Sequence, residues 1–156
     1  LVNRTGGELL QKNLELLGPI NYTEEEIRFA KEIQASTGKS QLGIDGTIKP
    51  MRETLENPGG GSTDVGDVSW NVPNINLGVT TAPIDTPWHS WAVVACGGMS
   101  IGHKGTIYAA KAMAITMSDL YKDEKLIKNI TKEYLQRKGD EKYEAMIDGP
   151  APINDN

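Results

Sequence analysis

The sequence has little cysteine, no excess of positive charge and no long apolar run, and each absence excludes a class of protein. Its single cysteine, Cys96, has no disulfide partner, so a disulfide scaffold is excluded and a reducing cytoplasm is the expected compartment. Acidic residues outnumber basic ones by 21 to 16, which leaves no basic footprint for nucleic acid or an anionic membrane. No apolar run approaches the ~20 residues of a membrane helix, and no signal-peptide pattern opens the chain. We therefore expect a soluble protein.

The length suits one domain. A chain of 156 residues buries roughly two thirds of its unfolded surface, which is enough for a core. Because the chain starts at Leu1 and not at a methionine, we expect a piece of a longer protein.

Four segments have the apolar spacing of helices: 7–17, 24–36, 102–121 and a last one that begins after Asp123 and ends at Gly139. A shorter helix or helical turn is expected over 64–70. In the second helix, Thr23 and Glu26 match a capping box. Acids at 24–26 resemble a catalytic carboxylate pair, but acids in a first helical turn favour the positive end of the helix dipole, which is the preferred interpretation.

Two short apolar segments suit buried strands, 75–79 and 91–96. The order helix, helix, loop, strand, strand, helix, helix predicts an α/β fold with helices packed on a small sheet. So few strands leave helix surface uncovered, which indicates missing sequence or a partner chain. Residues 38–60 are expected to form a long loop with a functional or lid-like role, and 148–156 an irregular tail.

The candidate chemistry lies between Gly59 and His103. Glycines 59–61 open onto Ser62, Thr63 and Asp64, and a glycine-rich turn lets the backbone approach a ligand closely. His89, between two tryptophans, supplies a nitrogen suited to zinc, manganese or cobalt. A surface or core role for His89 and a capping role for Asp64 and Asp67 stay open.

Other chemistries have weaker support. Residues 59–64 do not form a phosphate-binding loop, because no Gly-Lys-Ser/Thr follows these glycines. Asp85, His89 and Ser90 are residue types of a nucleophilic triad, but no nucleophile elbow surrounds the serine. His103 suits a helix start, and Lys104 beside it is able to meet an anionic substrate.

Several motifs together carry a family resemblance: Gly-Ser-Thr-Asp-Val-Gly-Asp-Val-Ser-Trp at 61–70, Pro-Trp-His-Ser-Trp at 87–91, His-Lys-Gly at 103–105 and the Ala-Ala-Lys-Ala-Met-Ala helix. Asn3-Arg4-Thr5 and Gly18-Pro19-Ile20 extend the similarity over most of the chain. The chain resembles metal-dependent amidohydrolases of the aminoacylase and carboxypeptidase G type. That resemblance implies the C-terminal part of a mixed-sheet, zinc-peptidase-like catalytic domain, the segment that follows a lid or dimerisation domain.

The resemblance implies specific roles as well. His89 matches the last metal-ligand histidine, and Gly61, Ser62, Thr63 and Asp64 match the turn that lines the substrate. Two divalent ions, zinc or manganese, are implied in the full-length enzyme, which cleaves N-acyl amides of the aminobenzoyl-glutamate or dipeptide kind and is expected to be an oligomer, such as a dimer. The family's other ligands and its glutamate base lie upstream of the matched segment, so no catalytic residue is assigned here and the isolated chain is expected to be inactive.

Two functions from different classes remain open. The chain is either part of a metallo-amidohydrolase, completed by the remainder of its catalytic domain or by a partner subunit, or a non-catalytic interaction module derived from such a domain. A reading frame that continues upstream into the missing ligands would favour the enzyme.

Overall fold

The computed structural model describes residues 1–51, 63–145 and 149, and this part of the chain is helical. It contains α1 (Arg4–Leu17), α2 (Glu24–Ser36), α3 (Val65–Asn71), α4 (Trp91–Gly97), α5 (Ser100–Lys122) and α6 (Glu124–Lys138). No strand occurs among these residues, so the predicted α/β fold with helices on a small sheet is wrong.

Both predicted strands failed for identifiable reasons. The apolar run 91–96 lies in α4, and a short buried run has no periodicity that separates a strand from a helix. Residues 72–80 have no regular structure: they lie beside α5 and make isolated hydrogen bonds to loops, such as the bond from Thr80 Oγ1 to the Asp45 carbonyl (2.8 Å). The alternating pattern therefore marks an extended segment that packs on a helix without a ladder partner.

The helix predictions are confirmed. In α2 the Thr23 hydroxyl accepts from the Glu26 amide while the Glu26 carboxylate accepts from the Thr23 amide, so the capping box is present. Asp123 caps α6, which ends at Gly139 with a φ of 57°. The short helix or helical turn predicted over 64–70 is α3.

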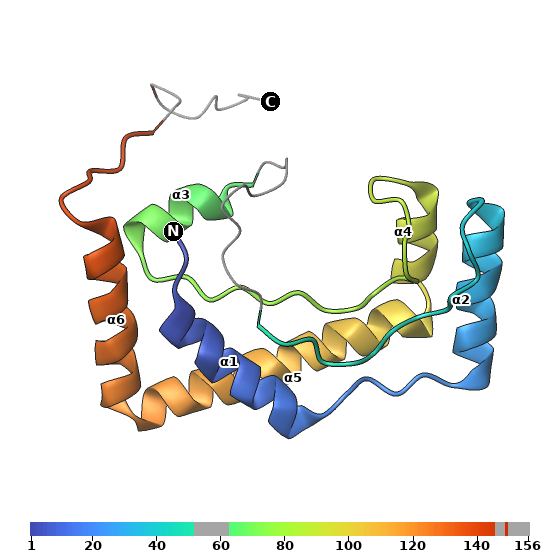
Figure 1. The fold of residues 1–156 in the computed structure, drawn as a ribbon, viewed down its shortest axis with the longest axis horizontal. Coiled ribbons are helices and arrows are strands. Elements are labelled where there is room, and N and C mark those ends of the chain that lie inside the picture. Colours follow the sequence, from blue (N-terminus) through green and yellow to red (C-terminus); the bar gives the residue numbers. More distant parts are fainter. Residues whose placement is uncertain (52–62, 146–148, 150–156) are drawn as a thin grey trace, which may run out of the picture.

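α5 is the element on which the others assemble. It packs against α1, α4 and α6, and α1 also packs against α6. Figure 1 shows α5 crossing the molecule, with α6 and α3 on one side and α4 and α2 on the other. A small apolar core at the α2 and α4 side contains Ile33, Ala92, Cys96 and Ile101.

Polar side chains join the helices at the other side. The side-chain amide of Asn3 donates to the Ile130 carbonyl (2.8 Å). The Glu133 carboxylate accepts from the backbone amides of Arg4 and Thr5 at the start of α1. The buried Asn13 amide donates to Thr116 Oγ1 and to an Asp119 carboxylate oxygen. These bonds fix α1 against α5 and α6.

Two long irregular segments complete the described structure, 38–51 and 72–90. Figure 1 shows both running along α5. Gly46 sits so close to the Ile20 carbonyl that a Cβ there would come within 2.0 Å of its oxygen. Residues 52–60 of the predicted loop, and the predicted tail apart from Gly149, lie outside the described residues.

Candidate functional site

His89 lies in a tight loop that immediately precedes α4. Its side chain is exposed and its backbone φ is 59°, in the left-handed region that non-glycine residues rarely adopt. Asp85, at the start of the same loop, has the same φ. Two such residues in one short loop cost conformational free energy, which is typical of segments that present a functional side chain.

The loop is held by its own hydroxyl groups. Thr86 Oγ1 donates to the Pro83 carbonyl (2.8 Å), and Ser90 Oγ donates to the Pro87 carbonyl (2.5 Å). Because the Ser90 hydroxyl is committed to Pro87, it does not form the bond to His89 that a nucleophilic triad requires. Trp88 and Trp91 are 67% and 57% exposed, so they do not enclose the imidazole in this chain.

A buried glutamine anchors the loop to α2. Gln34 is fully buried, and its amide nitrogen donates to the Gly43 carbonyl (3.1 Å) and the Ile84 carbonyl (2.9 Å). Its side-chain oxygen accepts from the Gly43 amide (2.7 Å). Gln34 thus ties both irregular segments to one helix, and Ile84 directly precedes the His89 loop.

The second candidate segment lies at the start of α3. Thr63 and Asp64 are both exposed, and Thr63 Oγ1 accepts a long hydrogen bond from the Val65 amide (3.3 Å). Asp64 occupies the N-cap position without a side-chain capping bond. Asp67 accepts from the Tyr143 hydroxyl (2.8 Å), which raises the pKa of Tyr143. Gly61 and Ser62 lie outside the described residues.

The structure does not bring the two candidate segments together. Thr63 and Asp64 lead into α3 and His89 leads into α4, and Figure 1 shows these helices on opposite sides of the molecule. Within the described ranges, no three His, Cys, Asp or Glu side chains converge so as to hold a metal ion.

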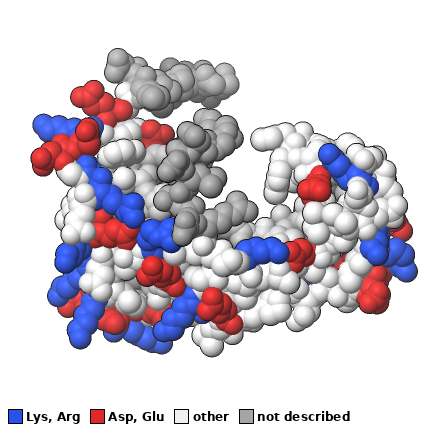
Figure 2. Space-filling view, viewed as in Figure 1, with Lys and Arg blue, Asp and Glu red and all other residues white. Residues whose placement is uncertain are grey.

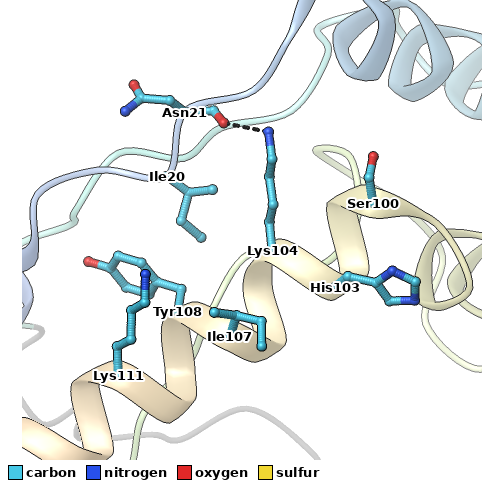
Figure 3. Close-up of a pocket in the computed structure, with 8 residues that line it drawn as sticks. All are labelled: Ile20, Asn21, Ser100, His103, Lys104, Ile107, Tyr108 and Lys111. Atoms are coloured by element: carbon cyan, nitrogen blue, oxygen red, sulfur yellow. Dashed lines mark hydrogen bonds between the residues drawn. The ribbon is translucent and has the colours of Figure 1, made fainter.

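A cavity of about 420 Å³ lies between the start of α5 and the segment that links α1 to α2. It is lined by Ile20, Asn21, Ser100, His103, Lys104, Ile107, Tyr108 and Lys111. Figure 3 shows Lys104 and Tyr108 extending toward Ile20 and Asn21, while His103 points the other way.

Lys104 is engaged within the chain. Its ammonium donates to the Asn21 carbonyl (2.8 Å) and pairs with Glu26 at 2.6 Å. Burial raises the pKa of Glu26, but the hydrogen bonds from Lys104, the Thr23 amide and Ser100, with the Lys104 charge, outweigh burial and lower this pKa to about 2. Lys104 therefore joins α5 to α2, and the interpretation of the 24–26 acids as helix-start residues holds.

Comparison with known proteins adds a relative. Over 171 aligned positions the chain is 32% identical to a subunit of p-aminobenzoyl-glutamate hydrolase from Escherichia coli (strain K12). The chain is similar to that hydrolase component. The match includes 94% of this chain and 36% of the relative, so the chain spans about a third of the relative's length. No protein-family model matches the chain, and no solved structure matches it at the same level of significance.

The resemblance to a hydrolase of the aminobenzoyl-glutamate kind is thereby confirmed along 94% of the chain. The described residues fit a metal site only in part, because they offer one exposed imidazole in a constrained loop and no converging set of ligands. Among them, no helix is both long and apolar enough to cross a membrane.

Sequence reasoning missed one group that organises the site and assigned the wrong partner to another. Gln34 was overlooked, because a glutamine in an amphipathic helix is ordinarily a solvent-exposed residue. Lys104 was identified as a candidate partner for an anionic substrate, whereas its anion is Glu26 of the same chain. The apolar spacing of α2 was the available clue, since Ala30, Ile33 and Gln34 share its buried face.

Proposed function

We propose that this chain is the C-terminal part of a metal-dependent amidohydrolase that cleaves N-acyl amides of the aminobenzoyl-glutamate or dipeptide kind. The observation that carries the proposal is the 32% identity along 94% of the chain to a named hydrolase subunit. The exposed loop around His89 supports it, because non-glycine residues with a positive φ cluster at functional sites. The unpaired Cys96 is consistent with action in the reducing cytoplasm.

In this proposal the chain supplies one metal ligand and part of a substrate wall. His89 is the ligand, and Gly61, Ser62, Thr63 and Asp64 are the wall. The described part of that wall agrees with the role: both side chains are exposed, and the Asp64 carboxylate is not used to cap α3. An acidic side chain and a hydroxyl there would bind donor groups of an amide substrate.

A divalent ion, zinc or manganese, would supply Lewis acidity and lower the pKa of a bound water when present. A single imidazole does not hold a catalytic ion. The other ligands of the two ions, and the general base, must therefore come from residues outside this chain. The isolated chain is therefore inactive in this proposal, and the active unit contains the remainder of the catalytic domain or a partner subunit, in an oligomeric protein.

A non-catalytic interaction module is the second candidate. The observation that favours it is that no set of metal ligands converges within the described residues. Such a module would keep the helical scaffold and bind a partner. His89 would then bind a metal ion no more tightly than any other exposed histidine.

Manganese broadening in proton NMR tests the ligand assignment directly. The chain has two histidines, and both His89 and His103 are exposed, which makes His103 a matched control. Substoichiometric Mn²⁺ is expected to broaden the His89 ring signals first, with the signals assigned from His89→Ala and His103→Ala variants. Equal broadening of both rings at every manganese concentration would count against His89 as the metal ligand.

A further inference from the structure

The long helix α5 has an uncovered apolar face along almost its whole length. Ile107, Met113, Met117 and Tyr121 are 57%, 56%, 51% and 86% exposed. At about 3.6 residues per turn, their positions along α5 keep them within roughly a third of the helix circumference. We name this face the outer stripe; its exposed residues are His103, Thr106, Ile107, Ala110, Met113, Ala114, Met117 and Tyr121.

No residue of the outer stripe carries a formal charge at neutral pH with histidine neutral. The charged residues of α5 fall elsewhere on the helix: Lys104, Lys111 and Lys122 follow one edge, and Asp119 lies toward the buried face. Figure 2 shows charged side chains gathered over α6 and at the outer side of α2. A solvated helix face normally carries such charges.

A separate group of exposed apolar side chains lies around the start of α4, where Val94 is 76% exposed and Trp88 and Trp91 are 67% and 57% exposed. Aromatic and methionine side chains gathered on one surface are typical of the centre of an interface, because they bury much area at a modest cost in conformational entropy. An apolar patch of this extent on a water-soluble chain indicates an interaction surface.

We propose that the outer stripe is the surface on which the rest of the catalytic unit docks. The inference rests on the proposed function, and it names the partner: a polypeptide equivalent to the part of the relative that has no counterpart here. The match covers 36% of the relative while using 94% of this chain, so about two thirds of the relative has no counterpart here and is available to cover an exposed face.

A second copy fits the outer stripe less well. A two-fold axis applies the same surface of both copies to each other, and antiparallel packing of α5 on α5 brings like edges together. Lys111 and Lys122 occupy one edge, so that arrangement sets positive charges side by side. A different polypeptide carries no such restriction.

Co-expression tests the proposal. The full chain is produced with the part of the Escherichia coli protein that lies outside the match, and the complex is measured by size-exclusion chromatography with light scattering. Met117→Lys places a charge in the middle of the outer stripe. Leu16→Lys is the matched control, because Leu16 is 74% exposed on α1 and lies off the stripe. Peroxide oxidation of Met113 and Met117, read by mass spectrometry, reports whether the stripe is covered.

We expect a complex for the natural sequence and for Leu16→Lys, and a loss of affinity of roughly tenfold or more for Met117→Lys. Oxidation of Met113 and Met117 should slow by about the same factor in the complex, since a buried thioether is shielded from peroxide. Failure to form a complex, or equal affinity for both variants, overturns the proposal. A homodimer of this chain that Met117→Lys dissolves also overturns it, because the occupant is then a second copy.

The two proposals fail separately. Measured without divalent metal, His89→Ala should leave the association unchanged, because His89 lies outside the outer stripe and then shares no ion with the partner. A complex that forms through the stripe but shows no preference of Mn²⁺ for His89 would remove the metal-ligand role of His89 and leave the docking surface standing.

Discussion

The two faces of α5 are built on different principles. The inner face is small and crowded: a Cβ added to Gly105 would lie 2.5 Å from the Thr80 carbonyl oxygen, and one added to Gly102 would lie 2.5 Å from the Cys96 carbonyl oxygen. The outer stripe has large side chains and nothing described in the chain that touches them closely enough to bury them. The inner face is thus specified by close approach of backbone segments within the chain. The outer stripe has large apolar side chains like those of a protein core, but no described residue buries them.

The largest effect should come from filling the inner face. Gly105→Val is expected to destabilise the chain by about 3 kcal/mol or more, because the new side chain meets the Thr80 backbone and neither the helix nor the segment is free to move far. Urea unfolding followed by circular dichroism measures the loss.

Gly66→Ala is the matched control for that substitution. Gly66 lies in α3 and has open space where a Cβ would be placed, so alanine should stabilise the helix by roughly 0.5–1 kcal/mol. The two glycine substitutions should therefore differ in sign. If Gly105→Val unfolds at the same urea concentration as the natural sequence, the crowding on the inner face is absent in solution.

The buried amide of Gln34 should rank next. Gln34→Ala leaves the Gly43 amide and the Ile84 carbonyl without their side-chain partner and opens a cavity, for an expected loss of about 2–3 kcal/mol. Gln41→Ala, in the exposed part of the 38–51 segment, should change stability by less than about 0.5 kcal/mol.

Gln34 also tests the link between packing and the His89 loop. Because Ile84 directly precedes that loop, Gln34→Ala should raise amide hydrogen exchange across 84–90 more than in α6. Exchange that stays unchanged in 84–90 would show that the loop is fixed by its own threonine and serine bonds alone.

Lys104 gives a smaller effect with a distinct pH dependence. Lys104→Met leaves the Glu26 carboxylate without its cation and should cost about 1–2 kcal/mol at neutral pH, less than for a fully buried pair because the lysine is partly solvated. The pKa of Glu26 is lowered from 4.5 to about 2 in the folded chain, so its contribution is complete above about pH 4.5 and is lost as the pH falls toward 2.

The measurement is urea stability from pH 7 to pH 2 for the natural sequence and for Lys104→Met. The variant should lose less stability over that range, since its Glu26 pKa is closer to the ordinary value. Glu133 keeps a residual acid sensitivity in both proteins: burial raises the pKa of Glu133, but hydrogen bonds from Thr5, Arg4 and Arg137 lower it to about 2. Parallel curves for the two proteins would show that Lys104 does not set the Glu26 pKa.

The helices were predictable because their signals are local. The Thr23 and Glu26 capping box, the glycine after α6 and the alanines of α5 each specify backbone geometry within a few residues. The sheet was mispredicted because strands are specified by distant partners, and the residues from Trp91 to Cys96 carry no periodicity that distinguishes α4 from a strand.

For the candidate site, the sequence identified the loops that carry the candidate residues but not the hydrogen bonds that anchor the His89 loop. His89 and the 61–64 turn stood out through residue type and glycine content, and their metal and substrate roles stay predictions. The anchoring role of Gln34 was not predictable, because a buried amide depends on carbonyl groups that only the folded chain brings within hydrogen-bonding distance. The uncovered helix surface was anticipated from the shortage of strands, although the strands themselves do not form.

The outer stripe should give the smallest effect of all on the isolated chain. Met117→Lys is expected to change its stability by less than about 0.5 kcal/mol, since Met117 is 51% exposed and loses few contacts when replaced. Ala112→Lys, on the fully buried inner face of the same helix, should instead prevent stable folding or cost several kcal/mol, because it buries an unpaired charge. Urea unfolding of both variants measures the contrast. A Met117→Lys loss comparable with that of Ala112→Lys would mean that the stripe already packs against something in the chain in solution, and the surface would then have no room for a partner.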